Sequence, residues 1–158
     1  MRKACLSLVC SLTLIGLSCQ DSPPTPPPAK VRINGTTWTV ELAMTEAARY
    51  QGLSGRRELA PGRGMLFVYP QEKPLSFCMR GCEIPIDIAF LDRNLRVVNL
   101  YEMQIEPDRV GRTAYRSYVP VQFALEVGGG SLKQAGVRVG QQAEFINVPP
   151  ADQAEPGD

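Results

Sequence analysis

The chain has 158 residues and a formal net charge of +1, with 14 glycines, 14 prolines and no histidine. This length fits one domain, and the abundance of Gly and Pro favours short elements joined by turns over long helices. The missing histidine excludes His-based acid–base catalysis, a Ser-His-Asp triad and any metal site that contains histidine.

The first nineteen residues are typical of a bacterial lipoprotein signal peptide. Arg2 and Lys3 precede an apolar stretch of 14 residues, Ala4–Leu17, which is shorter than the roughly 20 residues of a membrane-spanning helix. It ends at Ser18-Cys19, which resembles a lipobox, where the cysteine is diacylated (palmitate) and becomes the N-terminus. The alternative is an ordinary secretory signal cut near Ser18. We expect an exported protein, anchored to a membrane through lipid on Cys19 and facing the periplasm or the cell exterior.

The segments that flank the expected domain are rich in proline. Residues 20–30 contain five prolines, and such a chain adopts extended polyproline II structure at ~3.1 Å per residue. We expect this segment to be a semi-rigid tether for a β domain at residues 31–148, and the polar tail 149–158 to be disordered. Removal of the signal peptide lowers the number of basic residues from 17 to 15, while the number of acidic residues stays at 16. A charge so near zero gives no electrostatic basis for binding nucleic acid.

Turn chemistry predicts a hairpin and a short helix at the start of the domain. In Val31–Leu42, Asn34-Gly35 suits a two-residue type I′ turn between two runs of alternating polarity. The helix follows over the sequence TEAARYQG, with Thr45 as its N-cap and Gly52 as its stop.

The rest of the domain reads mainly as strands, the first of them ended by Pro70. One turn of helix is expected at SLKQAG, and the longest loop at Gln104–Pro120, where long loops are often functional. The predicted strands cover residues 65–69, 75–79, 86–92, 95–103, 121–127 and 142–148. This pattern predicts a mainly β fold, either an antiparallel β-sandwich of jelly-roll type or a partly closed barrel, with one or two short helices.

Six fragments in this order resemble one family: RYQGLSGR, GMLFVYP, SFCMRGCEIPIDIAFLD, YRSY, FALEV and AGVRVGQ. They are similar to domain-of-unknown-function family 192, whose pattern runs approximately GLM-x-R, GMLF-x-F, FWMK-[NG]-T-x-IPLDI-x-FID, ALEL and GI-x-x-GD. The resemblance spans residues 31–148. It implies a compact β-sandwich of jelly-roll type that is often exported or membrane-tethered in bacteria and archaea, and it supplies no reaction.

Cys78 and Cys82 stand where the family pattern has Trp and Thr, so these thiols cannot carry the family's general activity. In one continuous strand they would lie about 13 Å apart, whereas a disulfide needs Cα atoms within about 7 Å. A turn at Gly81 would allow the bond, and in an oxidising envelope a structural disulfide is favoured over a redox centre. Free buried thiols are another alternative. Two thiolates without histidine do not complete a zinc site, and we expect no metal and no cofactor.

Asp87 lies in the apolar run EIPIDIAFL, where strand alternation places it beside apolar neighbours. A carboxylate there needs a cation or several N–H donors, or its pKa will rise. A buried Arg–Asp pair that fixes the loop is favoured over a functional acid.

The arginines near this region could hold a carboxylate, a phosphate or an acidic sugar through bidentate contacts. We therefore predict a non-catalytic binding or cell-envelope accessory module for a small acidic ligand or envelope polysaccharide. One alternative is a hydrolase or lyase that uses Asp87 with arginines, and another is a thiol-redox accessory that uses Cys78 and Cys82. The candidate ligand-binding residues are Arg49, Arg56, Phe77, Met79, Arg80, Asp87 and Tyr118.

Overall fold

The hairpin and the helix at the start of the domain form where turn chemistry predicts them. In the computed structural model, which describes residues 26–156, β1 (Lys30–Ile33) and β2 (Thr36–Ala43) pair antiparallel across the turn. Asn34 and Gly35 have φ of 50° and 78°, as a type I′ turn requires. The Thr45 side chain accepts the Ala48 N–H at the start of α1 (Glu46–Gln51), and Gly52 ends the helix with positive φ.

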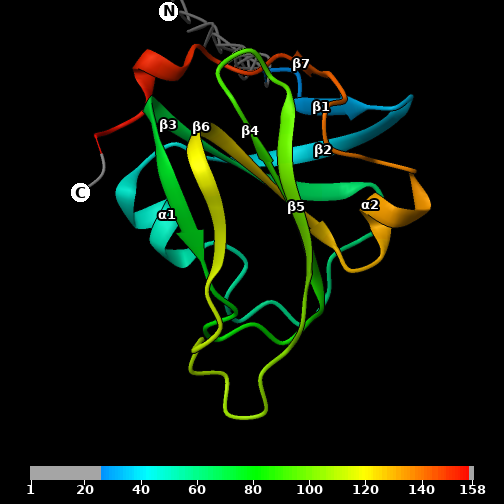
Figure 1. Cartoon of the computed structure of the whole chain (residues 1–158), viewed down its shortest axis with the longest axis vertical. Coiled ribbons are helices and arrows are strands. Elements are labelled where there is room, and N and C mark those ends of the chain that lie inside the picture. The colour runs from blue at the N-terminus through cyan, green and yellow to red at the C-terminus, as the bar shows by residue number, and fades with distance from the viewer. Residues whose placement is uncertain (1–25, 157–158) are drawn as a thin grey trace, which may run out of the picture.

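Seven strands form one curled, mixed sheet, in the order β5-β4-β6-β3-β2-β1-β7 (Figure 1). The remaining strands are β3 (Arg63–Phe77), β4 (Ile86–Leu91), β5 (Val97–Met103), β6 (Tyr115–Gly128) and β7 (Ala143–Ile146). All neighbours are antiparallel except β2 and β3. Residues 26–156 contain only two α-helices, α1 and the one-turn α2 (Ser131–Gln134), so the predicted mainly β fold is confirmed in its partly closed barrel form.

The barrel closes at one place, where the residues just before β5 meet the chain that leads into β7. Arg96 and Gln142 form an antiparallel bridge, and the Ala143 N–H donates to the Leu95 carbonyl at 2.8 Å. Beyond this point the two edge strands diverge, so the sheet is a half-barrel.

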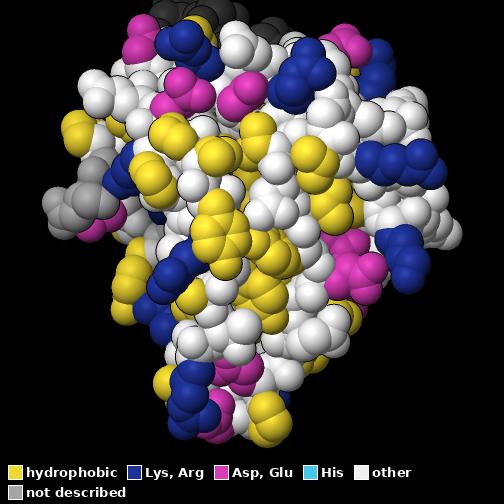
Figure 2. All heavy atoms as spheres, viewed as in Figure 1, with side chains coloured by type: hydrophobic (Ala, Val, Ile, Leu, Met, Phe, Trp, Pro, Cys, Tyr) yellow, Lys and Arg dark blue, Asp and Glu magenta, His cyan; other side chains and the backbone are white. Residues whose placement is uncertain are grey.

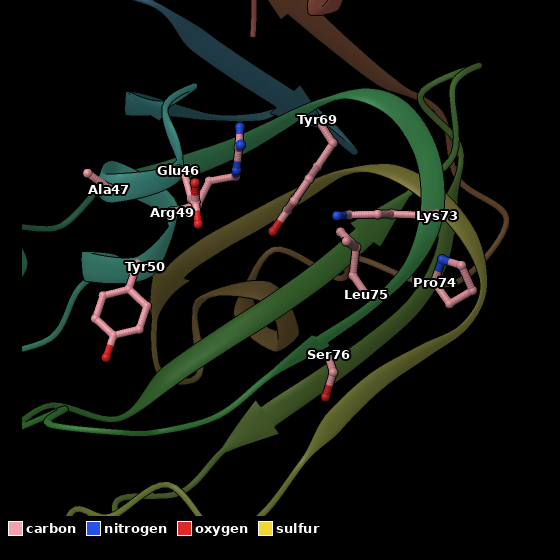
Figure 3. Close-up of a pocket in the computed structure, with 9 residues that line it drawn as sticks. All are labelled: Glu46, Ala47, Arg49, Tyr50, Tyr69, Lys73, Pro74, Leu75 and Ser76. Atoms are coloured by element: carbon pink, nitrogen blue, oxygen red, sulfur yellow. The ribbon is translucent and has the colours of Figure 1, made fainter. Parts of the chain in front are cut away.

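Strand β3 differs from the prediction, because it passes through Pro70 and Pro74 as one element. Val68 pairs with Phe123 and Lys73 with Val121, so four residues of β3 oppose the single residue Gln122. Proline cannot donate to a ladder, and a bulge of this kind removes the need for its N–H. Gln122 bonds the Pro70 carbonyl through its side-chain amide at 3.2 Å. The bulge bends the strand and carries Tyr69 and Lys73 into the space beside α1 (Figure 3).

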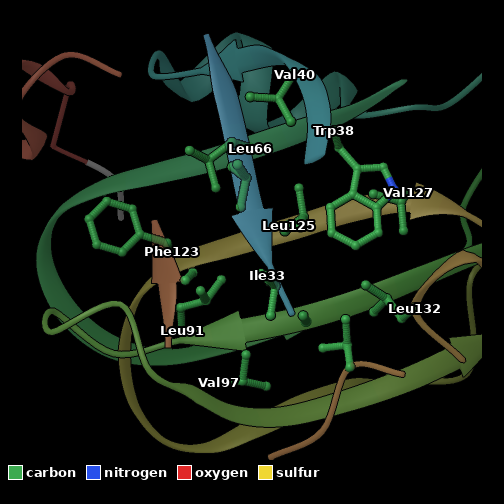
Figure 4. Close-up of a cluster of buried hydrophobic side chains, with 14 of the residues drawn as sticks. Ile33, Trp38, Val40, Leu66, Leu91, Val97, Phe123, Leu125, Val127 and Leu132 are labelled. Atoms are coloured by element: carbon green, nitrogen blue, oxygen red, sulfur yellow. The ribbon is translucent and has the colours of Figure 1, made fainter. Parts of the chain in front are cut away.

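Two hydrophobic cores lie on the two faces of the sheet. The inner core fills the curl of the barrel around Trp38, Leu66 and Leu125 (Figure 4). The outer core includes Phe67 and Phe90, with Leu53 from the turn after α1 among its buried residues. Along β6, odd-numbered residues 123–127 face the inner core and Ala124 faces the outer one, which is the alternation expected of a strand buried on both faces.

The long loop is shorter than predicted, because Tyr115–Pro120 belongs to β6. What remains, residues 104–114, projects from the lower end of the barrel (Figure 1). Glu106 organises this loop by accepting the backbone N–H groups of Gly111, Arg112 and Thr113 at 2.7–2.8 Å. These bonds lower the pKa of Glu106 to about 2.

The C-terminal tail also differs from expectation, since it packs on the barrel through Pro156. Residues Ala151–Gln153 form a 3₁₀ turn (η1), Ala154 is buried, and Arg49 donates to the Glu155 carbonyl at 2.8 Å. The predicted signal peptide 1–19, the lipidation of Cys19 and tether residues 20–25 lie outside the described residues. Within the described part, no helix is long and apolar enough to cross a membrane.

Candidate functional site

Two adjoining cavities form a cleft between α1 and β3, which we call the α1–β3 cleft. The outer cavity measures about 580 Å³ and is lined by α1 residues and by the bent part of β3 (Figure 3). The inner cavity measures about 270 Å³, and its lining includes Cys78, Arg80 and Cys82 from the segment after β3. Both share the lining residues Arg49, Tyr50, Tyr69 and Ser76. Figure 2 shows apolar side chains gathered in the middle of one face of the molecule, with Lys and Arg side chains beside them.

Arg49 is a fixed cation of the cleft. Its guanidinium donates to the carbonyls of Met44, Val68 and Glu155 at 2.8–3.0 Å and lies 4.9 Å from the Tyr69 ring centroid. With its donors used by backbone carbonyls, Arg49 positions α1 against β3 and the tail, and contributes its charge to the cleft.

Arg80 and Lys73 bring two further cations to the cleft. The Arg80 guanidinium carbon lies 3.8 Å from the Tyr50 ring centroid, and Nη2 donates to the Tyr50 carbonyl at 2.6 Å. The Lys73 ammonium lies 5.5 Å from the Tyr69 ring centroid. The cleft thus combines positive charge with flat aromatic surface, a combination suited to anionic ring compounds.

Glu126 is the buried acid of the inner cavity. It lies on β6, paired with Met65 on one side and Ile88 on the other, and only 5% of its surface is exposed. Burial raises the pKa of Glu126 to about 8, because these apolar surroundings disfavour the charged form. At neutral pH its carboxyl group is therefore largely protonated and can donate a hydrogen bond.

The structure brings together only three of the predicted site residues, Arg49, Phe77 and Arg80, all of which line the inner cavity. Arg56 instead forms a bidentate pair with Glu41 on β2, with both N–O distances 2.6 Å. Met79 is fully buried in the outer core.

Tyr118 is 74% exposed at a second irregularity of β6, where its φ is 61°. It lines neither cavity of the cleft.

The expected Arg–Asp pair is wrong, since the partners of Asp87 are backbone N–H groups. Asp87 is 1% exposed and accepts from Gly130 and Leu132 at the start of α2, both at 2.9 Å. Burial raises the pKa of Asp87 above its ordinary value, and the two hydrogen bonds oppose that rise. Asp87 therefore ties α2 to β4, and the geometry does not place it with arginines as a hydrolase or lyase would need.

We expect Asp87→Asn to lower the unfolding free energy by about 2 kcal/mol, because one carboxylate oxygen is replaced by an NH₂ group that faces an N–H donor. Urea denaturation measures this change. The control is Glu144→Gln, which removes an exposed acid 2.8 Å from Arg32 and should change the free energy by less than about 0.5 kcal/mol. Equal stability of Asp87→Asn and wild type would contradict the role given to Asp87.

Cys78 and Cys82 are both free cysteines in the structure, the first exposed and the second buried, so the expected disulfide is not formed there. Gly81 makes the turn that brings the two together, with φ of 64°. Burial raises the pKa of Cys82 to about 11, which suppresses the thiolate that redox exchange requires.

We expect Cys78 to react with Ellman's reagent in the folded chain without residues 1–19, and Cys82 to react only after unfolding. At pH 8, a pKa near 11 leaves about one thiol in a thousand ionised. Counting released thiolate before and after guanidinium addition checks this. Cys78→Ser should lose the fast reaction, and a non-reduced protein with no reactive thiol in either state would instead establish the disulfide.

Sequence reasoning missed Glu126, Tyr69 and Lys73. For Glu126 a signal was present, because a single acid interrupts the apolar run FALEV as Asp87 interrupts its own run. Tyr69 and Lys73 gave no such signal, because only the β3 bulge turns them toward α1.

These features define a class of protein: a small, partly closed β-barrel with a helix-covered cleft that contains a buried acid. The chain belongs to the DUF192 family, described as "Uncharacterized ACR, COG1430", whose model matches residues 29–145. The resemblance seen in the sequence is thereby confirmed. No curated protein matches the chain.

Two solved structures are similar to this chain. One, from Sinorhizobium meliloti 1021, is described as a candidate transcription regulator; it is 29% identical with a TM-score of 0.68, and the match covers 78% of this chain and 98% of that one. The other is a protein of unknown function from Novosphingobium aromaticivorans DSM 12444, 30% identical with a TM-score of 0.66, covering 74% and 83%.

Proposed function

We propose that this protein is an exported, lipid-anchored binding module that holds a small acidic ligand in the α1–β3 cleft, without catalytic chemistry of its own. The observation that carries the binding proposal is the lining of the cleft, where Arg49, Lys73 and Arg80 lie beside tyrosine rings. Against these three cations the lining has two acids, Glu46 and Glu126. With Glu126 protonated, the cleft carries net positive charge and favours an anion.

Export and anchoring are supported by the signal-like residues 1–19 and the proline-rich segment before the barrel. We expect Cys19→Ser to move the protein from the membrane fraction to the soluble fraction and to abolish incorporation of labelled palmitate. We do not extend transcriptional regulation from the S. meliloti protein to this chain, because a net charge near zero offers no electrostatic basis for binding nucleic acid.

Isothermal titration with benzoate and glucuronate tests the binding proposal, with uncharged benzamide as the control ligand. We expect at least one acid to bind and benzamide to bind about tenfold more weakly, because it lacks the charge that the cations attract. Lys73→Gln should weaken binding of the acid by a similar factor.

The matched control variant is Arg56→Gln, because Arg56 pairs with Glu41 and lines neither cavity. It should bind as wild type does. Failure of both acids to bind, or equal binding of benzoate and benzamide, would remove the proposed function.

A further inference from the structure

The proposed function leaves the buried acid of the inner cavity without a role. Only 5% of the Glu126 surface is exposed, and within residues 26–156 no group forms a hydrogen bond or an ion pair with its carboxyl group. Because no fully sealed side-chain oxygen of the described residues lacks a partner, the Glu126 carboxyl oxygens open onto the inner cavity that they line. Buried polar side chains in folded proteins nearly always have a partner, because losing water without replacement is costly. An acid whose oxygens open only onto a cavity is therefore positioned to take its hydrogen-bond partner from the molecule that fills this cavity.

The walls of the inner cavity are apolar and aromatic. Leu53 from the turn after α1, Phe67 from β3 and Phe77 from the end of β3 line it together with Tyr69. Phe67 and Phe77 meet edge to face, with ring centroids 4.9 Å apart. Such surroundings suit a flat ring more than a hydrated sugar.

The titratable groups around Glu126 come from three segments. Tyr69 belongs to β3, Arg49 and Tyr50 belong to α1, and Cys78, Arg80 and Cys82 belong to the segment after β3. Neither β4 nor β6 adds another titratable side chain to the lining.

Both cations of the inner cavity already have partners. Arg49 binds three backbone carbonyls and contacts the Tyr69 ring, and Arg80 binds the Tyr50 carbonyl and contacts the Tyr50 ring. Their positive charges repel an incoming amine, although neither guanidinium forms an ion pair with the Glu126 carboxyl group. An uncharged acceptor oxygen on the ligand meets no such barrier.

We infer that the Glu126 carboxyl group forms a subsite that donates a hydrogen bond to a carbonyl oxygen of the ligand, and that the cleft binds aromatic oxo-carboxylic acids. The ring and its oxo group enter the inner cavity, where the Glu126 carboxyl donates to the carbonyl oxygen. The ligand's carboxylate lies among the cations of the outer cavity, so this inference rests on the proposed function and names its ligand class.

Protonation of Glu126 then controls affinity. With a pKa of about 8, the donor is present below that pH. Above it the ionised carboxylate offers no proton and repels the carbonyl oxygen, so the Kd should rise about tenfold for each pH unit.

Titration with 4-acetylbenzoate and its near-isostere 4-isopropylbenzoate, from pH 6 to pH 9.5, tests the subsite. We expect the acetyl compound to bind about tenfold more tightly at pH 7, since only it accepts the hydrogen bond. Glu126→Gln should keep this preference, because the amide still donates, but lose its pH dependence. Glu126→Leu should abolish the preference, while the surface control Glu102→Gln should behave as wild type.

The outcomes separate the two proposals. Equal affinity for the two benzoates, or a preference in wild type that does not fall above pH 8, overturns the subsite and leaves the acid-binding cleft in place. Absence of binding by both compounds overturns the cleft and the subsite together.

Discussion

Raising the pH from about 5 to about 9 should lower the unfolding free energy by several kcal/mol, and Glu126→Gln should remove most of that loss. In the unfolded chain the pKa of Glu126 returns to the ordinary value of 4.5, whereas in the folded state it is about 8. Between these values the folded state keeps a proton that the unfolded state has released. The stability that Glu126 contributes is therefore complete below about pH 4.5 and is lost as the pH rises to about 8.

The magnitude follows from the separation of the two pKa values. Each pH unit in this window contributes about 1.4 kcal/mol, so the full loss is on the order of 5 kcal/mol. Asp87, whose pKa is also raised, acts in the same direction. Glu106 acts in the opposite sense and at lower pH, because the stability that its lowered pKa provides is lost between about pH 4.5 and about 2.

Urea unfolding at half-unit pH steps measures the effect, and Trp38 reports it. Trp38 is the only tryptophan in the sequence and is 2% exposed within the inner core, so its fluorescence follows loss of the barrel. Glu144→Gln, at an exposed acid paired with Arg32, serves as the control and should show the wild-type slope. A pH-independent free energy between pH 5 and pH 8 in wild type would show that Glu126 is not buried as a protonated acid.

Gly64→Ala should destabilise the barrel by about 3 kcal/mol or more, at the upper end of what overpacking costs. Gly64 lies on β3 between Val40 of β2 and Val127 of β6. A Cβ there would be 2.5 Å from the Glu126 carbonyl oxygen and 3.0 Å from a Val127 methyl group. The first contact is with backbone in a paired strand, so the two strands would have to separate to relieve it.

The matched control is Gly128→Ala, on the adjoining strand β6. Its Cβ would meet only the Ser131 hydroxyl oxygen, at 3.7 Å, so we expect a change within about 0.5 kcal/mol. Thermal unfolding by circular dichroism compares the two variants, with a loss of roughly 6–12 °C expected for Gly64→Ala alone. Similar midpoints for both would show that the close approach of β3 and β6 can relax.

Local chemistry explains which parts of the fold could be predicted from the sequence. Asn34-Gly35 and the Thr45 and Gly52 caps specify their turns through neighbouring residues alone, and both elements form as expected. The path of β3 through Pro70 could not be predicted in this way, because a glutamine on another strand fills the bulge. Sequence spacing contains no information about such a partner.

The candidate site was less predictable, because its members meet through tertiary structure. Asp87 was recognised as a buried acid that needs donors, but its donors are backbone N–H groups of Gly130 and Leu132, 43 and 45 residues further along the chain. Glu126 meets Arg80 and Tyr69 only because β6 pairs with β3 and the segment after β3 folds back over it. Arginines close in sequence, such as Arg56, point elsewhere.

The pairing of the first strand with the last has a consequence for how the chain reaches its native state. β1 is held by β2 on one side and by β7 on the other, with Val31 opposite Phe145. During synthesis β1 therefore presents an open edge until almost the whole domain has left the ribosome, and such edges recruit other chains. A chain that stops before Ala143 lacks β7 and should aggregate. A chain that ends just after Pro156 should fold slowly and cooperatively, with the pairing of β1 and β7 formed last.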